Sequence, residues 1–275
     1  MKIKATVLCE NCVFSNLGAI AEHGWSVYLE TDRGNYLFDT GQGLALINNA
    51  RIFKKDLSKI RGIILSHHHS DHTGGLMDAL TESGPVDVYA HPGLFKEGFL
   101  VRSGEKYIGV PYARIALESK GARFRYNKEF IEIAPGLHIT GEVPRLTDFE
   151  TGDKDLVLKT EEGLVRDPLL DDQSIVVETE KGLVIILGCS HAGVINIIDY
   201  AVKKTGQERI HAVIGGTHLW TVSAEQQEKT IQAFKDYKIE RLGVSHCTGL
   251  KVAGRLAQEL EEKFFFCNVG TVIEA

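Results

Sequence analysis

The chain has 275 residues, of which 43% are hydrophobic and 25% charged, a balance typical of one large globular domain or two small ones with ample core. This composition excludes disordered and collagen-like chains. The formal net charge is −6 and the cationic residues are scattered along the chain, which argues against nucleic acid or an anionic membrane surface as the partner.

The cysteines and the first residues bear on location. Five cysteines at irregular spacings do not form the even-numbered framework of secreted disulfide-bonded proteins, and we interpret them as reduced thiols. Residues 1–8 lack the apolar core of a signal peptide, and no segment reaches the length of a membrane span. We therefore expect a cytoplasmic protein.

The first half of the chain combines strand patterns with short helical ones. Alternating or continuous apolar residues predict strands at 2–8, 25–30, 36–39, 60–65, 86–90, 123–126, 130–133 and 137–139, and a helix at 44–53. Residues 93–120 lose this regular spacing because glycines and Pro111 interrupt them, and we interpret them as a lid inserted over a site. Residues 144–172 are acidic and polar, which is typical of a long loop.

The second half repeats the plan. We expect a hairpin at 174–179 and 182–187, helices at 194–204, from 224 and at 252–262, and strands at 211–214, 241–245 and 264–272. Ser223 and Gln226 have the spacing of a capping box at the start of the second of these helices. Strands alternate with helices, and several strand ends are followed by a histidine.

A histidine-rich motif follows the strand at 60–65. It reads His67-x-His69-x-Asp71-His72 and precedes Gly74-Gly75, so that it occupies a strand-to-helix loop. Imidazole and carboxylate are ligands suited to zinc, iron or manganese, and so many of them within six positions exceed what one ion takes from a short segment. The motif therefore predicts two metals. A histidine-rich surface tract and a pH-responsive cluster are the alternatives.

Two isolated histidines, His191 and His246, also follow predicted strands. Cys189 and Cys247 each lie within two residues of one of them. We interpret these cysteines as small buried residues beside metal ligands.

Together with Phe38-Asp39-Thr40-Gly41, these motifs resemble the metallo-β-lactamase superfamily over essentially the whole chain. The resemblance implies an α/β protein, a four-layer αββα sandwich formed by a single domain at 1–275. It implies two divalent metal ions, zinc with manganese or iron as alternatives. His67, His69 and His191 would bind one ion, and Asp71, His72 and His246 the other, with Asp71 also the catalytic residue. Asp39 would accept a hydrogen bond from a ligand imidazole, or else be a turn residue before Gly41.

One stretch departs from the family pattern. Many members with two metals have a bridging aspartate where this chain reads Gly215-Gly216-Thr217-His218, and no carboxylate stands there. We therefore expect His218 near the site, as a ligand or substrate contact. Arg145 and His23 are further candidates for contact with substrate or metal, whereas His68 is expected to point away from its neighbours.

The resemblance implies a metal-dependent hydrolase of a phosphoester or other ester, acting on a small anionic molecule through a metal-bound hydroxide. Phrases such as Gly188-Cys189-Ser190-His191 and Gly215-Gly216-Thr217-His218 resemble the dihydropterin-methyl-ribofuranosylaminobenzene-phosphate synthases. The alternative is therefore a transferase of methanopterin-type biosynthesis, in which an arylamine displaces diphosphate from a dihydropterin diphosphate. A non-catalytic metal or ligand sensor is the second alternative. A homo-oligomer is left open.

Overall fold

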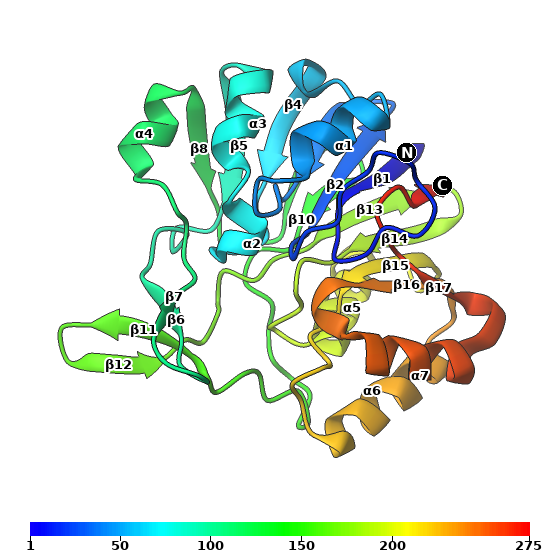
Figure 1. The fold of residues 1–275 in the computed structure, drawn as a ribbon. Coiled ribbons are helices and arrows are strands. Elements are labelled where there is room, and N and C mark those ends of the chain that lie inside the picture. The colour runs from blue at the N-terminus through cyan, green and yellow to red at the C-terminus, as the bar shows by residue number, and fades with distance from the viewer.

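The computed structural model describes residues 1–275, and two seven-stranded sheets form its centre (Figure 1). The first sheet has the order β18 (Val272–Glu274), β1 (Ile3–Cys9), β2 (Ser26–Thr31), β3 (Gly34–Phe38), β4 (Ile60–Ile64), β5 (Val86–Ala90) and β8 (Ala122–Tyr126). The second has the order β17 (Phe264–Phe266), β16 (Ile239–Ser245), β15 (Ile210–Gly216), β14 (Gly182–Ile186), β13 (Ile175–Thr179), β10 (Leu137–Ile139) and β9 (Ile131–Ala134).

The helices divide between the outer faces of these sheets. The α-helices are α1 (Leu46–Ile52), α2 (Ser70–Thr73), α3 (Leu76–Ser83), α4 (Arg114–Ser119), α5 (Val194–Thr205), α6 (Ala224–Asp236) and α7 (Leu250–Leu260), and short 3₁₀ turns cover Leu57–Lys59, His246–Thr248 and Glu261–Lys263. In Figure 1, α1, α3 and α4 accompany the first sheet and α5, α6 and α7 the second. None of these helices has both the length and the apolar character needed to cross a bilayer.

Three separate hydrophobic clusters correspond to the three interfaces of a four-layer sandwich. Because successive side chains of a strand point to opposite faces, Leu37 packs with α1, α3 and α4, whereas Phe38 packs between the sheets. In the same way Val184 faces the other sheet and Ile185 faces α5, α6 and α7. Strands covered on both faces read as continuous apolar runs, as β14 does. The predicted αββα sandwich is confirmed.

The parallel strands bring distant loops together. β3, β4, β5 and β8 are parallel in the first sheet, and β14, β15, β16 and β17 are parallel in the second. Parallel strands end at the same edge of a sheet, so the segments after β3 and β4 are neighbours, and so are those after β14, β15 and β16. The predicted histidines lie in these segments.

The two segments predicted to be irregular contain strands of a third, smaller sheet. Its order is β12 (Gly163–Arg166), β11 (Leu156–Thr160), β6 (Gly98–Leu100) and β7 (Lys106–Tyr107), and Figure 1 shows it projecting from the side of the sandwich. The prediction of a long loop at 144–172 is therefore corrected. β6 and β11 are short, and their pairing, Leu100 opposite Leu156, joins residues far apart in sequence, so local periodicity does not reveal it.

The last predicted strand, at 264–272, is also corrected. It is two strands in different sheets, because β17 pairs with β16 whereas β18 pairs with β1. An apolar run does not show that the chain crosses from one sheet to the other. The helix predicted from residue 224 is present as α6, and Ser223 Oγ accepts a hydrogen bond from the Gln226 backbone N–H at 3.1 Å, as half of a capping box would.

Candidate metal centre

The His67–His72 segment leaves β4 and enters α2 against the loop that follows β3. Thr40 N and Thr40 Oγ1 both donate hydrogen bonds to the His72 carbonyl oxygen, at 2.7 and 2.9 Å. A Cβ atom on Gly75 would lie only 2.2 Å from the Thr40 carbonyl oxygen, so glycine is required for this close approach. The glycine pair therefore allows the histidine motif to lie against the loop that carries Asp39.

The structure brings the predicted ligand residues to one place. The ring centroids of His67 and His69 are 4.4 Å apart, and those of His67 and His191 are 4.9 Å apart. On the other side, the rings of His72 and His246 are 5.1 Å apart, and His246 Nε2 lies 3.1 Å from Asp71 Oδ2. Residues from both halves of the chain thus meet between the two sheets' strand ends.

Two of these imidazoles are oriented by acceptors on their other ring nitrogen. His72 Nδ1 donates to Asp39 Oδ2 at 2.6 Å, and the other oxygen of Asp39 accepts from the Ser66 backbone N–H at 2.7 Å. This is the type of contact that the family resemblance implies for Asp39. His246 Nδ1 lies 2.9 Å from Asn11 Oδ1, an acceptor that sequence reasoning missed. Both contacts leave Nε2 of the ring directed towards the other predicted ligands.

The electrostatic state of the histidines differs across the centre. Burial and the neighbouring imidazoles lower the pKa values of His67, His69 and His191 well below the ordinary value, so these rings are neutral. Burial also acts to lower the pKa of His72, but the carboxylates of Asp39 and Asp71 outweigh it and raise this pKa to about 9.

The donor atoms present fit a divalent metal. Nε2 of His69 and both ring nitrogens of His191 are buried without a hydrogen-bond partner. An unpartnered buried nitrogen is unfavourable, whereas a neutral imidazole nitrogen is the form that binds a cation. Donor atoms lie within 4.8 Å of one another in four overlapping groups: His67, Cys189 and His191; His72, Cys189 and His246; Cys189, His218 and Cys247; His23, Asp71 and His246.

His23 and His218 lie beside this centre. His23 Nε2 is 3.3 Å from Asp71 Oδ2, and its side chain is largely exposed. The ring of His218 is 4.3 Å from that of His191, and its Nε2 is 3.6 Å from Asp153 Oδ2. Both side chains therefore lie close enough to the centre to contact a substrate or a metal there, the role for which the sequence made them candidates.

Arg145 and His68 have other partners. Arg145 Nη1 donates to the His191 carbonyl oxygen at 3.1 Å, and Nη2 donates to the carbonyl oxygens of Pro168 and Leu169. These contacts join the loop of His191 to the segment before β13, and they involve both Nη atoms of a side chain that was a candidate for contact with substrate. His68 points away from the ligands, as predicted, and its ring bonds Asp171 at 2.8 Å.

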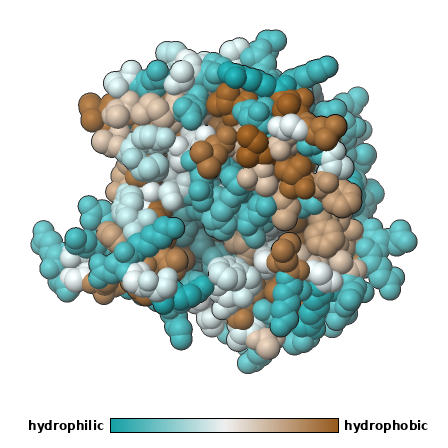
Figure 2. All heavy atoms as spheres, viewed as in Figure 1, coloured by the Kyte–Doolittle hydropathy of each residue, from teal (hydrophilic) through white to brown (hydrophobic).

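A cleft of about 180 Å³ opens over the centre, beneath the small sheet. Its lining residues include Lys106 on β7, Arg102 just after β6, and Trp220. Arg102 pairs with Asp155 and Asp153 at 2.7 and 3.1 Å, whereas Lys106 forms no ion pair. Figure 2 shows hydrophilic residues around the hollow between the small sheet and the rest of the molecule. Sequence reasoning missed these cations because nothing local distinguishes them from surface residues.

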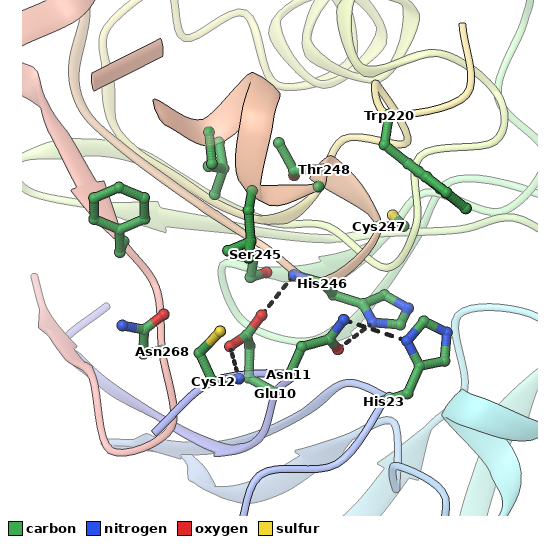
Figure 3. Close-up of a pocket in the computed structure, with 15 residues that line it drawn as sticks. Glu10, Asn11, Cys12, His23, Trp220, Ser245, His246, Cys247, Thr248 and Asn268 are labelled. Carbon is green, nitrogen blue, oxygen red and sulfur yellow. Dashed lines mark hydrogen bonds between the residues drawn. The ribbon is translucent and has the colours of Figure 1, made fainter. Parts of the chain in front are cut away.

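A second cavity of about 290 Å³ adjoins the cleft (Figure 3). The two share His23, Trp220, His246 and Cys247 as lining residues. Figure 3 shows His23, Asn11 and His246 joined by hydrogen bonds at one side of this cavity, with Trp220 and Cys247 nearby. Trp220 is 57% exposed and presents an aromatic surface that the sequence did not identify.

Comparison with known proteins places this arrangement in a family. The model of the metallo-β-lactamase superfamily matches residues 20–246. The chain is 30% identical over 283 aligned residues to the 7,8-dihydropterin-6-methyl-4-(β-D-ribofuranosyl)-aminobenzene-5′-phosphate synthase of Methanocaldococcus jannaschii, with 99% of this chain and 96% of that protein covered.

Solved structures agree. Tm1679, described as a metal-dependent hydrolase of the β-lactamase superfamily, is 29% identical to this chain with a TM-score of 0.85, and the match covers 99% of both chains. A diphosphatase of the PhnP family has a TM-score of 0.53 at 13% identity, covering 100% of this chain and 98% of that one, which shows the fold alone.

Proposed function

This chain belongs to the metallo-β-lactamase superfamily, and on that basis we propose that it is a metal-dependent hydrolase of a phosphoester or other ester of a small anionic molecule. The observation that carries the proposal is the convergence of His67, His69 and His191 with buried ring nitrogens that have no protein partner. Proteins similar to this chain include a hydrolase and a synthase. The attacking group is therefore water in the first case and an amine in the second.

The proposed cofactors are two divalent ions, zinc in the first place, with manganese or iron as alternatives. His67, His69 and His191 would hold one ion, and Asp71, His72 and His246 the other. Such ions polarise a phosphoryl or carbonyl oxygen and lower the pKa of a coordinated water. A centre of mainly imidazole ligands favours zinc over magnesium or calcium.

Other side chains orient the proposed metal ligands and line the cleft where the substrate would bind. Asp39 and Asn11 fix the rings of His72 and His246, so that these ligands need not reorganise when an ion or substrate binds. Lys106, unpaired and facing the cleft, can bind an anionic group of the substrate, and Arg102 can join it if its pairing with Asp155 loosens. Leu100 and Leu156 of the small sheet add apolar surface to the wall of the cleft.

A second candidate is the synthase reaction, and two observations favour it. One is the 30% identity to the Methanocaldococcus synthase over nearly the whole of both chains. The other is the cavity that adjoins the cleft at His246 and Trp220, which gives a second substrate a place beside the first. An arylamine nitrogen would form a bond to the methylene carbon of a dihydropterin diphosphate. The carbon–oxygen bond would break, diphosphate would leave with the electron pair, and the amine proton would pass to solvent.

Activity measurements on the metal-loaded protein separate these functions. The purified chain is stripped, reloaded with zinc and assayed with simple phosphodiesters, and with a dihydropterin diphosphate in the presence and absence of an arylamine. Turnover of phosphodiesters supports the hydrolase, and diphosphate release that requires the amine supports the synthase. Metal binding without turnover of any of these compounds supports the sensor.

Asp71→Ala tests the role of the centre. We expect it to lower turnover by at least about a hundredfold, a loss of roughly 2.7 kcal/mol in transition-state stabilisation. Asp78→Ala, which changes an exposed aspartate of α3, is the matched control and should leave turnover unchanged. Full turnover in Asp71→Ala would refute the proposed mechanism.

The proposed location remains the cytoplasm. All five cysteines are unpaired, which supports a reducing compartment.

A further inference from the structure

Many family members with two metals have a bridging aspartate at the end of β15, where this chain has none, and the structure leaves no room for one. A Cβ atom on Gly216 would lie 2.5 Å from Cys247 Sγ and 2.6 Å from the Gly188 carbonyl oxygen, and both distances are far below normal contact. Thr217 is committed elsewhere, because its hydroxyl lies 2.9 Å from Thr248 Oγ1. The close approach of the segments after β14 and β15 therefore excludes an acidic side chain at Gly216.

Cys189 lies on the segment that occupies this space. It is 2% exposed, and its Sγ is 3.1 Å from Nε2 of His72. The sulfur forms one close group of donor atoms with His67 and His191, and another with His72 and His246. No other residue belongs to both groups, so Cys189 stands between the two halves of the centre.

His191 gives independent support for a cation close to Cys189. It is 3% exposed, yet neither of its ring nitrogens has a hydrogen-bond partner. The unpartnered ring lies in the same group of donor atoms as Cys189 and His67. A shared cation would satisfy the nitrogen and the sulfur together.

We propose that the Cys189 thiolate is a ligand common to both metal ions, in place of the carboxylate that is absent from the 215–218 segment. The inference rests on the proposed function, because it concerns the ions of that centre. A thiolate carries the same single negative charge as a carboxylate, and its sulfur has lone pairs for two cations. Binding releases the thiol proton, since a coordinating thiol is deprotonated.

A sulfur ligand also sets the metal preference. Thiolate is a soft ligand that selects zinc or iron, whereas carboxylate and water suit magnesium and manganese. We therefore expect zinc to bind more tightly than manganese, and Cys189→Asp to narrow this difference. Competition between zinc and manganese, followed by metal analysis of the protein, measures the preference.

Two measurements test the ligand directly. X-ray absorption of the zinc-loaded wild-type protein should show a sulfur neighbour at about 2.3 Å from zinc. The cobalt-loaded protein should show thiolate-to-cobalt charge-transfer absorption in the near ultraviolet. Cys189→Ser should remove that absorption and weaken binding of one of the two ions by at least about tenfold. Two control variants should retain the charge-transfer absorption. Cys12→Ser changes the half-buried thiol near the second cavity, and Cys247→Ser changes the thiol beside His246.

Wild-type protein that binds two ions without a sulfur neighbour would overturn this inference and leave the proposed function intact. Charge-transfer absorption that persists in Cys189→Ser but disappears in Cys247→Ser would also overturn it, because the other thiol would then be the ligand. Failure of the chain to bind zinc or cobalt under any loading condition would overturn both the inference and the proposed function. Circular dichroism of each variant verifies folding, and the absorption measurement on wild-type protein needs no variant.

Discussion

Replacing Asp171 by asparagine tests how the His67–His72 segment is held in place. Asp171 precedes β13, is 1% exposed, and its Oδ2 accepts hydrogen bonds from the His68 backbone N–H at 2.9 Å and from His68 Nδ1 at 2.8 Å. Its other oxygen accepts a hydrogen bond from Lys96 Nζ, which also donates to Asp167. The carboxylate thus joins the histidine motif to the segment that enters the second sheet.

The expected loss of stability follows from these contacts. Removing one charge of a buried pair costs roughly 3–5 kcal/mol. Lys96 keeps Asp167, and asparagine can still accept one hydrogen bond, so we expect about 3 kcal/mol for Asp171→Asn, the lower end of that range. The melting temperature should then fall by roughly 6–12 °C, at about 2–4 °C per kcal/mol for a chain of this size.

The effect should depend on pH in a defined direction. Burial acts to raise the pKa of Asp171, but His68 and Lys96 outweigh it and hold this pKa well below its ordinary value. The unfolded chain therefore binds more protons at acidic pH, and the contribution is complete above the unfolded pKa of about 3.9 and is lost as the pH falls towards the folded value. The difference between wild type and variant should be smaller by roughly 0.7 kcal/mol at about pH 3.5 than at pH 7.

Urea unfolding of metal-stripped proteins at these two pH values measures both quantities, with Asp32→Asn, an exposed position, as the control. A loss at neutral pH of less than about 1 kcal/mol, the upper end of the usual contribution of an exposed ion pair, would refute the description of a buried pair. So would a difference that does not shrink on acidification.

Three other predictions concern the metal, the substrate and the His191 loop. Zinc at about one hundred times its dissociation constant should stabilise the stripped protein by about 2.7 kcal/mol, measured as a rise in melting temperature, and no rise would contradict a folded-state metal site. Lys106→Ala should raise KM for an anionic substrate about tenfold, or about 1.4 kcal/mol, with kcat nearly unchanged, and an equal effect on an uncharged ester would refute an anion-binding role. Arg145→Ala should lower the free energy of unfolding by about 1.5–3 kcal/mol, because its contacts are with backbone carbonyls, and a selective change in KM without loss of stability would support the substrate contact that the sequence predicts.

The sequence by itself located most of the strands and helices and most of the candidate centre, whereas the four layers of the fold came from the family resemblance. Alternating and continuous apolar runs located most of the strands, and the repeated order of strands and helices agreed with a sandwich. His67, His69, Asp71 and His72 could be selected because they share one short loop, so their proximity follows from covalent connection. His191 and His246 could be joined to them through the family pattern.

Only the tertiary structure decided which residues complete the surroundings. Asn11 meets His246 across 235 positions, and the small sheet depends on the pairing of β6 with β11. Cys189 read as a small buried residue in sequence, whereas the structure places its sulfur 3.1 Å from a nitrogen of His72. Such contacts arise from strand ends that meet at one edge of a sheet and from the close approach of backbones at Gly216. Local periodicity does not predict these contacts, because their distances are set by the packing of segments far apart in the chain.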